Sequence, residues 1–412
     1  NSSKNNIISF LRLTYSGYKY AISRPDNSHL IQQKAIFAHK NVQKMKNNLI
    51  NLLFCGLSLL ACTSLWGQEN DALHKDSTDF EFGVAELETN YAGFPDKMTT
   101  EANRKAYEAL KARCRKEVDE EGRKPWEALG ELYAWFGDFH LRVGNYSAPY
   151  MQREVPSYAS MEDYDPLPTC RKVTDRTFLI RFPSCAGDDP TPEWVEESIA
   201  AYRASGCENL IIDIRGNGGG RDGIFRPYTK LLYDREAKVD GVEIRNTPAH
   251  IAWIEDIESD WVQQLEEHMR KSEDEFVPMT PRWLEISYDS ISPLPRRAAL
   301  IIDGSVASSG EQMVLTLRAC SSRTTVYGRD HTMGCLDYSN CRTVNLPQSC
   351  ITLSVPMTRS YRLPDRGIDP TGIAPDVRIP LPLPDVLTDN VDEWTKWVAA
   401  DLEKGGGGSD TT

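Results

Sequence analysis

The sequence predicts an α/β fold, a core of alternating strands and helices preceded by a small N-terminal helical bundle. Apolar residues recur at helical spacing between about 79 and 143. From residue 177 onward, short apolar runs alternate with amphipathic helical segments, which indicates β-α-β units. These runs are continuously apolar, as expected of parallel strands that are covered on both faces.

The composition is that of a globular protein with an acidic body. The chain has 412 residues, of which 40% are hydrophobic and 26% charged, with a net charge of -13. Basic residues gather in the first 48 positions, where Asp26 is the one acid, so the rest of the chain is strongly acidic. This balance argues against a nucleic-acid partner.

Residues 45–67 have the pattern of a signal peptide, with a lysine-tipped start, an apolar stretch and small residues near the end. Residues 1–44 are expected to lie upstream of the true start. The chain is therefore expected to be exported from a bacterium, to be periplasmic, outer-membrane-anchored or secreted. Two alternatives stay open here: Cys62 is a lipidated membrane anchor, or cleavage after Gly67 releases a soluble chain.

The rest of the chain divides by composition. We expect the helical bundle over 68–145, a connector over 146–172, the core over 173–402 and a flexible tail over 403–412. A Trp- and acid-rich insert at 238–295, with one helix over 252–274, is expected to form a lid or arm outside the sheet. The core strands are predicted at 177–183, 209–214, 298–303, 324–328 and 351–358, with helices at 191–206 and 309–320.

The exported body contains eight cysteines. No Cys or Cys/His cluster has the spacing of a zinc site, so no metal and no cofactor is expected. Cys335 and Cys341 are six residues apart, and two alternatives are open for them: a disulfide across a hairpin, or free thiols.

Two motifs contain residue types that perform chemistry. IIDIRGNGGG, residues 211–220, is a buried strand that ends in three glycines, whose N–H groups could form a tight turn, a phosphate loop or an oxyanion hole. ASSGEQ, residues 307–312, places serines at the start of a helix, where a serine serves either as a cap or as a nucleophile beside free N–H groups.

With GRDHTMG (328–334) and GIAPDV (372–377), these motifs follow an order that resembles the carboxyl-terminal processing, or tail-specific, protease family and its tricorn-core relatives. The resemblance covers about residues 79 to 380. It implies a Clp protease/crotonase-like core of stacked β-β-α turns and a serine endopeptidase. The nucleophile would be Ser308, three residues before Glu311, with an oxyanion hole made by the N–H groups of Gly218 and Ser309.

The general base departs from the commonest family pattern. The family's Gly-Lys-Gly loop has no counterpart lysine here, and Met333, Gly334 or Cys335 takes its place. The tricorn-like branch instead uses a histidine in a Gly-Asp-x-His pattern, which GDFHLRV matches at His140. An imidazole with an ordinary pKa near ~6.5 suits this task. His331, in the GRDHTMG loop, is the alternative.

The third catalytic member is also altered. The tricorn-like branch has a glutamate before its Gly-x-x-Pro-Asp motif, whereas this chain offers Asp365, with Asp369 and Asp337 as alternatives. The chain has no room for a PDZ domain after the bundle. Substrate choice would then come from the bundle and the insert.

The function predicted on this basis is that of an exported serine-type peptidase, a hydrolase for proteolysis. It would cleave peptides or the C-terminal regions of unfolded proteins through an acyl-enzyme on Ser308. The alternative is a catalytically degenerate protein of the same fold that binds peptides or other ligands. A crotonase-type reaction is a third and weaker alternative, because nothing in the chain resembles a binding site for the phosphates of coenzyme A.

Overall fold

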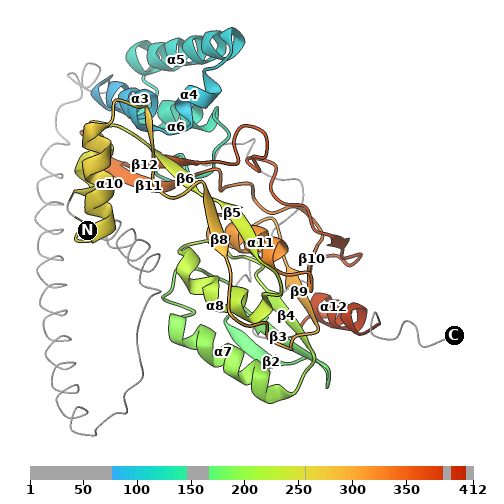
Figure 1. The fold of residues 1–412 in the computed structure, drawn as a ribbon. Helices are drawn as coiled ribbons and strands as arrows, with labels where there is room; N and C mark the ends of the chain where they lie inside the picture. Colours follow the sequence, from blue (N-terminus) through green and yellow to red (C-terminus); the bar gives the residue numbers. More distant parts are fainter. Residues whose placement is uncertain (1–76, 146–166, 256, 384–390, 405–412) are drawn as a thin grey trace, which may run out of the picture.

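The computed structural model describes residues 77–145, 167–255, 257–383 and 391–404 (Figure 1). The predicted signal peptide, the residues before it, Cys62, most of the connector and the end of the tail lie outside the described residues. Within the described ranges, no helix combines the length and the apolar composition needed to cross a bilayer.

A six-stranded sheet forms the centre of the core, in the order β13-β10-β9-β4-β3-β2. The strands are β2 (Thr169–Lys172), β3 (Thr177–Arg181), β4 (Asn209–Asp213), β9 (Arg297–Ile301), β10 (Thr324–Gly328) and β13 (Val377–Arg378). The strands β3, β4, β9, β10 and β13 run parallel, and β2 is an antiparallel edge strand. The predicted parallel sheet is confirmed for four of the five predicted core strands, whereas the fifth, expected at 351–358, belongs to a second, antiparallel sheet.

Helices cover both faces of this sheet, which explains why its strands are continuously apolar. Three helices pack on one face: α7 (Pro192–Ser205), α8 (Asp222–Leu232) and α11 (Ser309–Cys320). The helix α12 (Glu393–Lys404) covers the other face (Figure 1). Along β4, Ile212 enters the first core and Ile211 the second, as the alternation of side chains in a strand requires.

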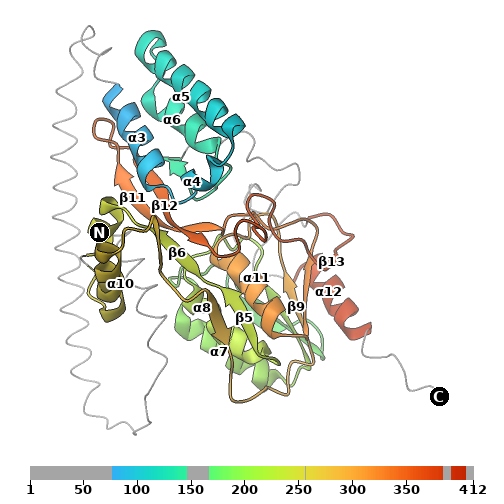
Figure 2. The same cartoon turned by 45° about the horizontal axis from the view of Figure 1, so that its top comes forward.

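A second, antiparallel sheet supports the N-terminal bundle. It contains β1 (Arg142–Val143), β6 (Val242–Arg245), β7 (Phe276–Pro278), β11 (Tyr338–Asn345) and β12 (Thr352–Ser360). The bundle, α3 (Ser77–Asn90), α4 (Phe94–Lys97), α5 (Glu101–Glu121) and α6 (Pro125–Ala134), lies over this sheet (Figure 2). Leu353 and Val355 of β12 share one hydrophobic core with Leu129 of α6.

The stretch 238–295 lies outside the six-stranded sheet, because β4 pairs directly with β9. Part of it forms the ribbon of β5 (Ala237–Asp240) and β8 (Trp283–Ile286), while β6 and β7 join the antiparallel sheet. The single helix expected over 252–274 was wrong. The structure has two helices, α9 (Pro248–Ile254) and α10 (Asp260–Lys271), because the chain leaves α9 at Ile254 and turns Ile257 into the local core.

Candidate active site

Ser308 occupies the sharp turn between β9 and α11. It is the residue before the first turn of α11 and has φ 53° and ψ −121°, a conformation that is strained for a residue with a side chain. Its neighbours Ala307 and Ser309 are buried, whereas Ser308 is partly exposed. The turn therefore presents the Ser308 hydroxyl at the positive end of the α11 dipole.

The glycine run packs directly against this turn. The carbonyl of Asn217 accepts the N–H of Ala307 at 3.0 Å, and the Asn217 side chain holds the run by bonds to Phe182 and Gly219. Gly219 has φ +98°, and a Cβ there would lie 2.6 Å from Ser308 Cβ. Only glycine allows this approach.

Two N–H groups at this junction are available for an oxyanion. Within the described part of the chain, neither the N–H of Gly218 nor that of Ser309 has a hydrogen-bond acceptor. A Cβ at Gly218 would meet nothing within 4 Å, so the space beside it is open. The assignment of these two donors remains a prediction, and this geometry is compatible with it.

Glu311 fastens the loop at residues 329–335 to the Ser308 turn. Its buried carboxylate accepts the N–H of Gly334 at 2.7 Å, the N–H of Cys335 at 2.8 Å and the hydroxyl of Thr332 at 2.5 Å. The N–H of Ser308 also approaches this carboxylate, at 3.3 Å. Burial raises the pKa of Glu311, and these donors oppose that shift. The backbone of this loop is thus held against the Ser308 turn at Cys335, whose carbonyl accepts the N–H of Ser308.

His140 lies close to Cys335. A ring nitrogen of His140 is within 4.8 Å of Cys335 Sγ, and the carbonyl of Cys335 accepts the N–H of Ser308 at 3.0 Å. Nδ1 of His140 is 2.7 Å from the carbonyl oxygen of Tyr338, so Nδ1 carries the proton and Nε2 keeps a lone pair. Burial lowers the pKa of His140 to about 4, which keeps the imidazole neutral. His331, the alternative base, is partly exposed in the 329–335 loop.

The choice of Asp365 as third member needs correction. Asp365 is exposed, and the acceptor on His140 Nδ1 is the carbonyl of Tyr338, not a carboxylate. The carboxylates of the alternatives Asp369 and Asp337 accept hydrogen bonds from backbone N–H groups. The Asp369 carboxylate accepts the N–H groups of residues 336 and 337, and that of Asp337 accepts those of 368 and 369.

Asp138 is the carboxylate that sequence reasoning missed. One of its oxygens lies within 4.8 Å of a ring nitrogen of His140, and Oδ1 accepts the backbone N–H of His140 at 2.8 Å. Burial raises the pKa of Asp138 to about 7. The signal was present, because Asp138 is the aspartate of the Gly-Asp-x-His pattern. All eight cysteines of the body are free thiols, Cys335 and Cys341 included.

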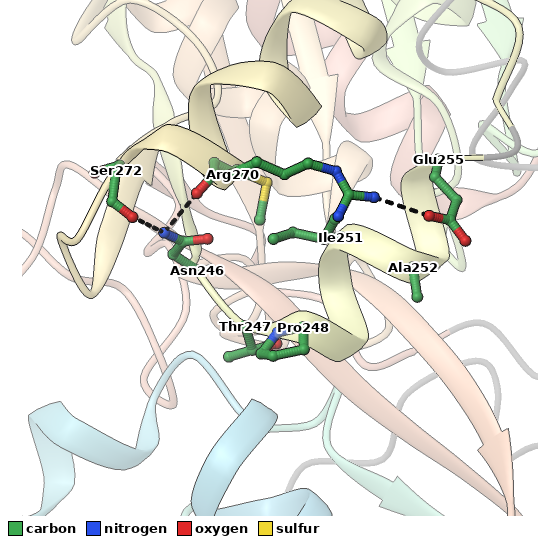
Figure 3. Close-up of a pocket in the computed structure, with 9 residues that line it drawn as sticks. Asn246, Thr247, Pro248, Ile251, Ala252, Glu255, Arg270 and Ser272 are labelled. Atoms are coloured by element: carbon green, nitrogen blue, oxygen red, sulfur yellow. Dashed lines mark hydrogen bonds and ion pairs between the residues drawn. The ribbon is translucent and has the colours of Figure 1, made fainter.

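A buried network of ion pairs lies at the end of β4, just before the glycine run. Arg215, three residues before Gly218, is fully buried and donates to Asp213 and to Asp392, each at 2.6 Å. Asp392 precedes α12, so that helix is tied to the strand end that carries the run. A depression of about 600 Å³ lies elsewhere, between α9 and α10 (Figure 3). Ile251, Met269 and the Arg270–Glu255 ion pair line it, and Ser308 does not.

A serine on a strained turn at a helix start, packed against a glycine run, is an arrangement that suits a serine-type peptidase. Residues 176–379 match the model of peptidase family S41. The chain thus carries a peptidase domain of family S41 and is a serine-type hydrolase.

The fold agrees with solved structures. The chain is similar to mature CPAF complexed with lactacystin at 13% identity, with a TM-score of 0.54 over 81% of this chain and 98% of that one. It is also similar to a protein from Parabacteroides merdae described as a peptidase, at 15% identity and a TM-score of 0.50 over 74% and 89%. No curated protein matches the sequence. The predicted fold class, a Clp protease/crotonase-like α/β core behind a helical bundle, is confirmed.

Proposed function

We propose that the chain is an exported serine endopeptidase that cleaves peptides or protein C-terminal regions through an acyl-enzyme on Ser308. The observation that carries this proposal is the contact between Gly219 and the Ser308 turn. This contact supports the proposal, because it brings the Ser308 turn, the N–H groups of Gly218 and Ser309 and the N-terminus of α11 together, and acyl transfer needs a nucleophile beside such donors.

In this mechanism Ser308 Oγ attacks the scissile carbonyl while Nε2 of His140 takes its proton. The N–H groups of Gly218 and Ser309 bind the oxyanion. His140 then protonates the leaving amine, and water hydrolyses the acyl-enzyme with His140 again as base. Cys335 is not the base, because burial raises the pKa of its thiol and keeps the proton on sulfur.

Substrate class and location rest on sequence and family. A family S41 domain supports a peptide or unfolded protein as substrate. The signal-peptide pattern of 45–67 supports export, to a periplasmic, outer-membrane-anchored or secreted location, with anchoring through Cys62 as one form of it.

Labelling with a fluorophosphonate probe tests the proposal. The probe should label Ser308 with one equivalent, and Ser308→Ala should lose labelling and lower peptide hydrolysis by about 10³-fold or more. Ser305→Ala is the matched control, since the buried Ser305 hydroxyl has no partner among the described residues. A folded wild-type chain that binds peptide but takes no label would instead be a degenerate binding protein.

A further inference from the structure

Three potential metal ligands from distant parts of the chain meet beside the candidate base. A carboxylate oxygen of Asp138, a ring nitrogen of His140 and the thiol of Cys335 all lie within 4.8 Å of one another. Asp138 and Cys335 are each 2% exposed, and His140 is partly exposed. About 200 residues separate the first two from the third, so spacing along the sequence did not reveal the cluster.

The carboxylate of Asp138 is only partly hydrogen-bonded by the protein. Oδ2 of Asp138 is buried and has no hydrogen-bond partner among the described residues. The buried hydroxyl of Tyr91 lies close enough to Asp138 for a side-chain hydrogen bond, which opposes the rise in the pKa of Asp138, but the two groups are not in regular hydrogen-bond geometry. A buried carboxylate oxygen without a well-aligned donor is costly, and a cation would lower that cost.

We infer that Asp138, His140 and Cys335 form a binding site for a zinc-type divalent cation. An oxygen, an imidazole nitrogen and a thiolate are a ligand set for Zn²⁺, whereas Ca²⁺ and Mg²⁺ prefer oxygen alone. Ligands on one tetrahedral Zn²⁺ lie about 3.3–3.8 Å apart, so small side-chain rotations close the site. The bond from Nδ1 of His140 to the Tyr338 carbonyl fixes the ring as metal-bound histidines require and leaves Nε2 for the metal.

A second cluster of potential ligands, one thiol and two carboxylates without a histidine, differs from this one in its surroundings. Cys114, Glu117 and Glu131 also lie within 4.8 Å of one another. There, however, Arg113 and Arg123 pair with both glutamates and balance their charge. The carboxylates of that cluster are satisfied, and they offer no unpaired oxygen to a cation.

The site has a consequence for catalysis, which rests on the proposed function. A cation on Nε2 of His140 takes the lone pair that would accept the proton of Ser308. Binding also displaces the proton of the Cys335 thiol to solvent. Metal binding and peptide hydrolysis are therefore mutually exclusive, and Zn²⁺ acts as a reversible inhibitor.

Calorimetric titration of the chelator-treated full chain with ZnCl₂ tests the site itself. We expect one Zn²⁺ per chain, and with Co²⁺ a thiolate-to-metal charge-transfer band. Cys335→Ser should abolish this band, and Cys335→Ser and Asp138→Asn should each weaken Zn²⁺ binding at least about tenfold. Cys350→Ser, which removes an exposed thiol elsewhere, should change neither. No binding, or undiminished binding by Cys335→Ser, overturns the site.

Activity measurements then separate the site from the proposed function. Ser308→Ala should bind Zn²⁺ as the wild type does, because the serine is not a ligand. In the wild type, Zn²⁺ should inhibit hydrolysis and excess chelator should restore it. The Cys335→Ser variant should need at least about tenfold more Zn²⁺ for the same fractional inhibition, with its own metal-free rate as the reference. Zn²⁺ that binds without inhibiting supports the site but overturns His140 as the base.

Discussion

The backbone N–H of Ser308 donates to the carbonyl oxygen of Cys335 at 3.0 Å. This bond joins the candidate nucleophile to the loop that holds a lysine in the commonest family pattern. The thiol of the same Cys335 faces a ring nitrogen of His140. One residue thereby connects the serine turn, the altered loop and the base that comes from the end of the helical bundle.

Gly219→Ala should lower peptide hydrolysis at least about 100-fold, because its Cβ would lie 2.6 Å from Ser308 Cβ at a backbone φ of +98°. Gly206→Ala is the matched control, since Gly206 also has a positive φ, +71°, but lies at the C-terminus of α7, where a Cβ meets nothing within 4 Å; we expect less than about a tenfold loss. The measurement is kcat/KM on a peptide for both variants. Equal losses would show that the Gly219 contact does not position Ser308.

Glu311→Gln should destabilise the fold by about 2–4 kcal/mol, because the amide leaves buried N–H donors of Gly334 and Cys335 without a full set of acceptors. Thermal and urea unfolding would measure this. Glu267→Gln, on an exposed face of α10, should leave the melting temperature unchanged. If Glu311→Gln melts like the wild type, the carboxylate is not what fixes the loop.

As the pH is lowered, the rate of peptide hydrolysis should begin to fall only at an unusually low pH. Protonated His140 cannot accept the serine proton, and burial disfavours that charged form, which lowers its pKa to about 4. In the presence of chelator, kcat/KM should stay level from about pH 8 to 5 and fall toward pH 4, whereas an ordinary histidine would cause a fall near ~6.5.

The variants His140→Ala and His331→Ala test which histidine is the base whose protonation lowers the rate at acid pH. We expect the first to lose several orders of magnitude in turnover and the second much less. The opposite order would place the base in the GRDHTMG loop.

Asp392→Asn should destabilise the chain by about 3 kcal/mol, because Arg215 and Arg181 would share only Asp213 in a buried site. The loss of hydrolysis should accompany it, since Arg215 precedes the glycine run. Glu393→Gln, on the exposed neighbour, is the control for both readouts. Unchanged stability in Asp392→Asn would mean that the α12 contact does not hold the strand end.

Much of the fold and one half of the site follow from the sequence. Continuous apolar runs such as residues 209–214 predict buried parallel strands, because a strand covered on both faces cannot alternate. The glycine run and the serines of ASSGEQ are local motifs, and each lies at the end of a strand, so their meeting at one sheet edge is also predictable. The break between α9 and α10 was missed, because the helical period continues across it and only tertiary packing turns Ile257 inward.

The sequence by itself determined the class of fold, the nucleophile candidate Ser308 and the histidine candidate His140, because each lies in a short motif with local physical meaning. The tertiary structure decided the surroundings of that histidine: the Tyr338 carbonyl on Nδ1, the exposed position of Asp365, and the meeting of Asp138 with Cys335. These contacts join segments about 200 residues apart. The distances between these residues are fixed by the packing of the bundle on the antiparallel sheet. That packing cannot be predicted from any single segment of the sequence.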